Sequence, residues 1–211
     1  MKLHSDSFEH RGVLPVRYAA GKPDADGYGF ADNRNPHLSW TDVPAGTQSF
    51  VLWVVDTNVP TRPEMAGVPD IEIPLRQART EFTHWIVVDI DAATREIVEA
   101  AHCNGVTAKG KAPSAVGPGN GKQGLNDYTG WFATDPDMAG DWHGYDGAFP
   151  PPNDQREHRY FFRLFALDVP SLNLPERYTA DQALRAMRGH IVAEDAIYAT
   201  YSLHPKLHKA L

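Results

Sequence analysis

The chain has 211 residues, 42% of them hydrophobic and 22% charged, which suits one globular domain with a sizeable core. A formal net charge of -7 does not favour nonspecific binding to nucleic acid or to an anionic membrane surface. The single cysteine, Cys103, excludes an internal disulfide and fits a reducing compartment. No apolar run is long enough to span a membrane and the N-terminus does not resemble a signal peptide, so we expect a cytoplasmic protein.

Short apolar runs separated by many prolines and glycines indicate a protein built mostly of strands and turns. The strongest runs are SFVLWVVD (49–56), FTHWIVVDID (82–91) and HRYFFRLFALD (158–168). All three are apolar on both faces, which is typical of central strands covered on both sides. The shorter segments VRYA (16–19) and HLSW (37–40) are weaker strand candidates.

Helical patterns appear near the end of the chain. Thr179 and Gln182 have the spacing of a capping box, which predicts a helix that begins at TADQALRAMRGH. The following segment, IVAEDAIYATY (191–201), is interpreted as a second short helix. Residues 57–81 and 104–157 show no regular pattern, and loops of this length are commonly functional. The absence of internal repeats and of a clear linker predicts a single domain over residues 1–211.

Polar residues stand at one end of each strong strand candidate. Asp56 closes the first, while His84 and His158 come near the starts of the other two, and Tyr160 shares a face with His158. If the first strand is antiparallel to the other two, these residues meet at one rim of the sheet. Such a group can bind a small anion or act as a general acid and base. The plainer alternative is that each histidine is only a satisfied polar residue at a strand end.

A family resemblance rests on several short blocks that occur in the family's order between about residues 35 and 201. The blocks are NPHLSW with VPAGTQSFVLWVVD, then DTNVP, HWIVVDI, GYDGAFPP with HRYFFRLFALD, and ALRAMRGHIVAEDAIYATY. Each block is a weak signal alone, but their shared order is specific. Through these blocks the chain resembles the phosphatidylethanolamine-binding protein family, also called Raf-kinase-inhibitor-like proteins, in its bacterial branch.

The resemblance implies a mainly β fold with one small sheet, one large central sheet and short C-terminal helices. It also implies a pocket for phosphate or other small anions, including phospholipid head groups. Apart from the resemblance, we expect no cofactor and no metal. The family's pocket residues correspond to Asp56, His84, Gly147, His158 and Tyr160. We expect Asp56 to orient a histidine, the two histidines and Tyr160 to donate to the anion, and Gly147 to bring a backbone N–H within reach.

The chain also departs from the family pattern. Asn58 stands where the motif's second aspartate is usual, Thr57 replaces a proline, and Ala148 replaces another. Asn58, Tyr145 and Phe149 are therefore candidates for the pocket rim. Segments 61–81 and 127–144 look longer than in bacterial relatives and are expected to cover the pocket or to form a surface for a partner.

The sequence leaves three functions open. The favoured reading is a binding or regulatory protein for a small anion, and no catalytic residue is assigned. The first alternative is an enzyme that uses Asp56 and a histidine on a small oxyanionic or carbonyl substrate. The second is an inhibitor of a kinase or protease that acts through its loops, and a homodimer is left open. The acidic residues around 134–146 do not follow EF-hand spacing, and no zinc, Walker or hydrolase motif is present.

Overall fold

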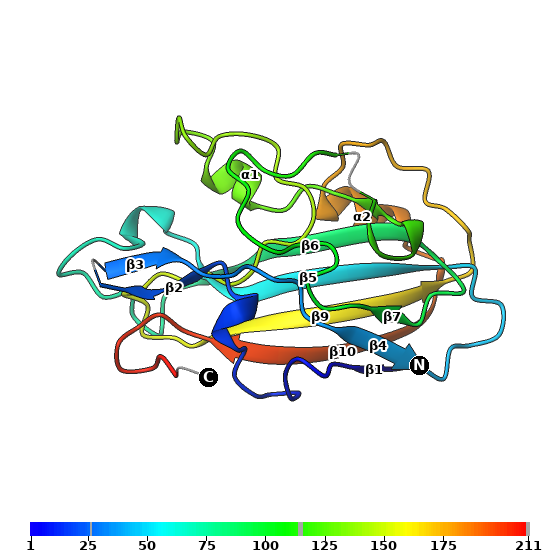
Figure 1. Ribbon diagram of the computed structural model, residues 1–211, viewed down its shortest axis with the longest axis horizontal. Helices are drawn as coiled ribbons and strands as arrows, with labels where there is room; N and C mark the ends of the chain where they lie inside the picture. The colour runs from blue at the N-terminus through cyan, green and yellow to red at the C-terminus, as the bar shows by residue number, and fades with distance from the viewer. Residues whose placement is uncertain (26, 114–115, 210–211) are drawn as a thin grey trace.

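The computed structural model describes residues 1–25, 27–113 and 116–209. It is mainly β, as the sequence predicted, with a five-stranded sheet in the order β10-β9-β5-β6-β8 and a three-stranded sheet in the order β1-β4-β7 (Figure 1). A two-stranded hairpin, β2-β3, lies at one end of the molecule (Figure 1). The strands are β1 (Lys2–His4), β2 (Gly21–Asp24), β3 (Gly27–Phe30), β4 (Leu38–Thr41), β5 (Ser49–Pro60), β6 (Arg79–Asp91), β7 (Glu96–Ile97), β8 (Lys122–Gln123), β9 (His158–Leu167) and β10 (Ile191–Tyr201). The helices are α1 (Tyr128–Trp131), α2 (Ala180–Ala186) and the 3₁₀ turns η1 (Val16–Tyr18), η2 (Pro63–Met65) and η3 (Pro118–Asn120).

The central strands are antiparallel, which confirms the predicted arrangement. β5 lies between β6 and β9, and Asp56 pairs with Phe82 on one side and with Tyr160 on the other. One face of this sheet packs on the small sheet through residues such as Trp40 and Phe50. The other face packs on a second cluster that includes α2. Burial on both sides explains why these strands are almost continuously apolar.

Two predicted elements differ in the structure. Residues 191–201 form β10 rather than a helix, because they pair with β9 along nearly their whole length. Ile197, Ala199 and Tyr201 then bury alternate side chains, so tertiary pairing overrides the helical composition. The segment VRYA forms the 3₁₀ turn η1 instead of a strand.

Other predicted elements are confirmed. HLSW contributes to β4, and α2 begins with the capping box formed by Thr179 and Gln182. The segment predicted as irregular after Asp56 is partly ordered, because β5 runs on to Pro60 and β6 begins at Arg79. None of the helices among the described residues is both long and apolar enough to cross a membrane.

Candidate functional site

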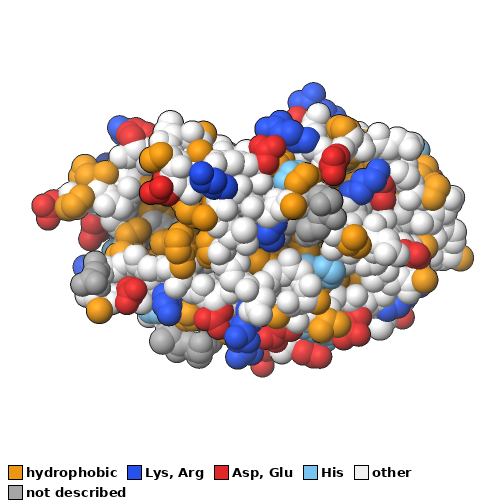
Figure 2. All heavy atoms as spheres, turned by 45° about the horizontal axis from the view of Figure 1, so that its top comes forward, with side chains coloured by type: hydrophobic (Ala, Val, Ile, Leu, Met, Phe, Trp, Pro, Cys, Tyr) orange, Lys and Arg blue, Asp and Glu red, His pale blue; other side chains and the backbone are white. Residues whose placement is uncertain are grey.

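A cavity of about 300 Å³ opens where β5, β6 and β9 meet the β2-β3 hairpin and the loop after β5. Its walls are mostly apolar, and five prolines line it together with seven aromatic side chains. The aromatic residues are Phe30, Phe82, Tyr128, Trp131, Phe132, Phe149 and Tyr160. Hydrophobic side chains gather around a hollow toward this end of the molecule (Figure 2). The cavity is thus an apolar pocket with a small polar area.

The polar area contains four of the residues predicted from strand ends. Asp56, His84, His158 and Tyr160 all line the cavity, and each is buried. Phe149 also lines it, as predicted. The antiparallel order of β9, β5 and β6 is what brings these side chains together from distant parts of the sequence.

His158 lies between two carboxylates. Its Nδ1 is 2.5 Å from Asp56 Oδ2, and its Nε2 is 3.0 Å from Asp154 Oδ2. Burial by itself would lower the pKa of His158, but the two carboxylates outweigh burial and raise the pKa to about 9. His158 is therefore an imidazolium that donates both N–H groups inside the protein. Asp56 contacts a histidine, as expected. Both His158 N–H groups are engaged within the protein, so donation from His158 to a ligand stays a prediction.

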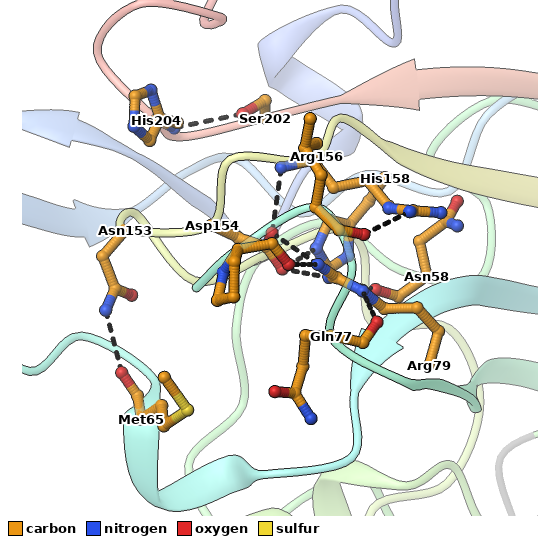
Figure 3. Close-up of polar contacts among 12 residues, drawn as sticks. Asn58, Met65, Gln77, Arg79, Asn153, Asp154, Arg156, His158, Ser202 and His204 are labelled. Atoms are coloured by element: carbon orange, nitrogen blue, oxygen red, sulfur yellow. Dashed lines mark hydrogen bonds and ion pairs between the residues drawn. The ribbon is translucent and has the colours of Figure 1, made fainter. Parts of the chain in front are cut away.

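Asp154 connects this histidine to Arg79 (Figure 3). The Arg79 guanidinium forms a bidentate ion pair with Asp154, including a contact of 3.1 Å from Nη2 to Oδ1. Arg79 also donates to the carbonyl of Asn58 at 2.9 Å. Asp56, His158, Asp154 and Arg79 form an alternating chain of charges that we call the charge chain, and its formal charges cancel.

Asp154 was not among the site residues predicted from the sequence. It precedes β9 within a segment interpreted as loop, and the only signal is its position four residues before His158. Asn58, predicted at the pocket rim, instead supports the strands beside it. Its N–H donates to Asp56 Oδ1 at 2.8 Å, and its Oδ1 accepts from the N–H of Arg159 at 3.1 Å. Asp154 thus supplies a second carboxylate to the site. The motif position itself, Asn58, carries an amide instead.

His84 has a different environment. Its Nδ1 lies 2.7 Å from the carbonyl oxygen of Asp146, an acceptor, so Nδ1 carries the proton. Burial lowers the pKa of His84, and the nearby Asp56 carboxylate opposes burial without reversing its effect. The ring is therefore neutral near pH 7, and Nε2 carries a lone pair. Within the described residues, this Nε2 has no side-chain partner, although the Gly147 backbone also lies near the ring.

The Tyr160 hydroxyl is the other uncommitted polar group. It is buried and makes no hydrogen bond in the described part of the chain. Burial, and then the Asp56 carboxylate, raise the pKa of Tyr160 well above its usual value, so the hydroxyl keeps its proton. The ring meets His84 edge-on, with centroids 5.2 Å apart. His84 Nε2 and the Tyr160 hydroxyl are thus neighbouring groups available to a ligand.

Gly147 and Tyr145 do not have their predicted roles. The Gly147 N–H donates to Asn33 Oδ1 at 2.7 Å, so it is not available to a ligand. A Cβ atom at position 147 would lie 2.1 Å from the Tyr18 carbonyl oxygen, and this close approach explains the glycine. The Tyr145 hydroxyl donates to the same carbonyl at 2.6 Å, which places Tyr145 in the core rather than at the rim.

A buried ion pair supports the loop whose carbonyl accepts a hydrogen bond from His84. Lys111 Nζ lies 2.9 Å from both carboxylate oxygens of Asp146, and Asn33 and Asn126 each donate to that carboxylate at 2.8 Å. Burial raises the pKa of Asp146, and Lys111 opposes this rise. The backbone N–H of Asp146 also donates to the His84 carbonyl at 3.0 Å. The network fixes the carbonyl that sets the tautomer of His84.

Both of the longer segments contribute to the pocket wall. Residues of the loop after β5, such as Pro63 and Gly67, line the cavity, as do Trp131 and Phe132 from the region of α1. Asn153 fastens the first of these loops: its Nδ2 donates to the carbonyls of Met65 and Ile71 at 2.8 and 2.7 Å, as Figure 3 shows for Met65. Within residues 1–25, 27–113 and 116–209, no cluster of three or more metal-binding side chains could hold a metal ion.

Comparison with known proteins gives one consistent result. A family model described as phosphatidylethanolamine-binding protein matches residues 4–202. A UPF0098 protein of Aquifex aeolicus is 32% identical over 201 residues, covering 95% of this chain and 88% of that protein. The UPF0098 protein YbhB of Escherichia coli is 30% identical over 202 residues, covering 96% of this chain and 100% of that protein.

Two solved structures are also similar. The phosphatidylethanolamine-binding protein homolog CT736 of Chlamydia trachomatis is 28% identical, with a TM-score of 0.62 and coverage of 95% of each chain. Escherichia coli YbcL has a TM-score of 0.67, is 22% identical, and covers 95% of this chain and 97% of its own; this second likeness concerns the fold alone.

Proposed function

The chain belongs to the phosphatidylethanolamine-binding protein family, and from this premise we propose that it binds a small ligand bearing an oxyanion. The polar head of the ligand would lie against Tyr160 and His84, with its remainder in the apolar part of the pocket. The observation that carries the proposal is the buried Tyr160 hydroxyl without a partner, next to a histidine nitrogen that is also uncommitted. A buried polar group without a partner is costly, and a bound ligand would remove that cost.

Binding of an anion should depend on pH in a direction set by His84. The neutral ring offers a lone pair, whereas the protonated ring offers an Nε2–H donor to an oxyanion. Because burial lowers the pKa of His84, this ring is extensively protonated in the ligand-free protein only at acidic pH. We therefore expect oxyanion affinity to rise as pH falls through the slightly acidic range, with net uptake of a proton on binding.

Calorimetric titration with inorganic phosphate, acetate and benzoate at about pH 6 and about pH 8 tests the proposal. We expect at least one of the three anions to bind, more tightly at the lower pH, and to lose about tenfold or more in affinity in His84→Gln or Tyr160→Phe. Tyr178→Phe is the matched control, because its buried hydroxyl belongs to the opposite face of the sheet. Failure of all three anions to bind the folded protein would refute the proposal.

One observation favours catalysis as a second candidate. A neutral histidine with a free Nε2 in an apolar pocket has the form of a general base. This differs from the pair of Asp56 and a histidine expected from the sequence, because the histidine that contacts Asp56 is His158, which is fully engaged. Turnover of a carbonyl substrate that disappears in His84→Gln would favour this candidate. Kinase or protease inhibition and a homodimer stay predictions.

A further inference from the structure

The number of free hydrogen-bond donors in the pocket limits which ligands can bind there. This inference rests on the proposed function and narrows the class of ligand. Both N–H groups of His158 are engaged, and the Gly147 N–H donates to Asn33. The Tyr128 hydroxyl, which also lines the cavity, donates to the Gly147 carbonyl at 2.8 Å. Tyr160 and a protonated His84 are then the two donors left to a ligand on this wall.

Two donors match a carboxylate better than a phosphate. A carboxylate has two oxygens, so each can accept one hydrogen bond, whereas a phosphate dianion would keep further oxygens desolvated. The charge chain is neutral in formal charge, and Asp56 Oδ1 and Oδ2 already accept hydrogen bonds. A dianion would therefore gain no excess positive charge here and would lie close to the Asp56 carboxylate.

The rest of the cavity favours a ligand whose part beyond the polar head is apolar and flat. Phe82, Tyr128 and Phe132 lie side by side on one wall, with centroids 5.1 Å apart for the first pair and 5.6 Å for the second. Trp131 lines the cavity and is 46% exposed, so it also borders the solvent. Aromatic walls of this kind gain most from a planar ligand that can stack or pack edge-to-face. Hydrophobic side chains dominate the hollow in this region (Figure 2).

We propose that the pocket binds a monocarboxylate on a flat apolar body, an aromatic acid, with one carboxylate oxygen at Tyr160 and the other at His84. His84 takes up one proton as the acid binds, so the net ligand is the anion plus that proton. The titratable groups that face His84 are Asp56 on β5, His158 and Tyr160 on β9, Tyr128 on α1 and Asp146 before β9. Asp56 favours the protonated ring and His158 opposes it, while the Asp146 carbonyl accepts the Nδ1–H in both states.

Calorimetry with benzoate, acetate, inorganic phosphate and benzyl alcohol tests this assignment. Burial of the ring should make benzoate bind about 10- to 100-fold more tightly than acetate, and also more tightly than phosphate. Repeating the benzoate titration at about pH 7 in buffers of different ionisation enthalpy should reveal uptake of roughly one proton. Benzyl alcohol should bind more weakly than benzoate at about pH 6, because its neutral hydroxyl lacks the charge that strengthens a hydrogen bond to protonated His84.

A surface variant separates the apolar wall from the polar head. Trp131→Ala should weaken benzoate several-fold and leave acetate unchanged, and Leu75→Ala, at a 55% exposed residue outside the cavity, should change neither. Phosphate binding as tight as benzoate, or benzyl alcohol binding equally well, would overturn the aromatic-acid assignment and leave the proposed function standing. Failure of phosphate, acetate and benzoate alike would overturn both.

Discussion

Lys111→Met is expected to destabilise the protein by about 3–5 kcal/mol at about pH 8, because it leaves a buried carboxylate without its cation. Lys111 is 13% exposed and Asp146 only 1% exposed, so water cannot replace the lost partner easily. The amide groups of Asn33 and Asn126 would still donate to the carboxylate, but they carry no charge to oppose the effect of burial. Urea denaturation at about pH 8 measures the change in the free energy of unfolding.

The loss should shrink as the pH falls. Burial already raises the pKa of Asp146, and without Lys111 it would rise further above the unfolded value. A carboxyl whose pKa is higher in the folded state favours folding most at low pH, and this contribution is lost as pH rises from the unfolded pKa to the folded one. Repeating the denaturation at about pH 5 should therefore recover part of the stability of Lys111→Met.

Lys122→Met is the matched control for this experiment. Its Nζ lies 3.4 Å from Asp89, but the lysine side chain is 49% exposed, so the pair is screened by water. We expect a change of less than about 1 kcal/mol with little dependence on pH. Equal losses in the two variants would contradict the special role given to the buried pair.

Asp154→Ala is expected to cost about 3–5 kcal/mol as well, because it interrupts the charge chain. Arg79 would keep its carbonyl acceptors and lose its carboxylate, while the Nε2–H of His158 would be left without an acceptor. The pKa of His158 should fall from its value of about 9, since one of the two groups that raise it is removed. Urea denaturation gives the first effect, and an NMR pH titration of the ring gives the second.

Asp141→Ala provides the comparison for a solvent-exposed pair. Asp141 and Arg177 form a similar bidentate contact, but their side chains are 44% and 64% exposed. The expected loss there is below about 1 kcal/mol. If Asp154→Ala lowered the free energy of unfolding no more than Asp141→Ala, then burial would not strengthen the charge chain.

The sequence predicted much of the frame of the site, for identifiable physical reasons. Long apolar runs covered on both faces mark central strands, and their polar ends mark the rim where antiparallel neighbours meet. Asp56, His84, His158 and Tyr160 were found in this way and line one cavity. The short motifs that resemble the family pointed to the same residues. The family model matches residues 4–202, nearly the whole chain.

The roles of the two histidines could not be predicted, because they depend on burial and on groups supplied by loops and by a neighbouring strand. His158 is charged because of Asp56 on β5 and Asp154 in a loop, and His84 is neutral because it is buried. The proton of His84 lies on Nδ1 because the Asp146 carbonyl accepts it. No periodic pattern in the sequence marks such partners, because a loop can place a side chain beside a histidine whatever their separation in the chain. β10 was mistaken for a helix for a related reason, since its pairing with β9 is also a tertiary effect.

The two histidines differ in protonation, and NMR of the imidazole nitrogens as a function of pH measures this difference. We expect His158 to stay protonated through neutral pH, with a pKa of about 9, and His84 to be neutral at about pH 7 with the proton on Nδ1. His158→Gln and His84→Gln would assign the two sets of signals. A neutral His158 at about pH 7, or a His84 that carries its proton on Nε2, would rule out these protonation states.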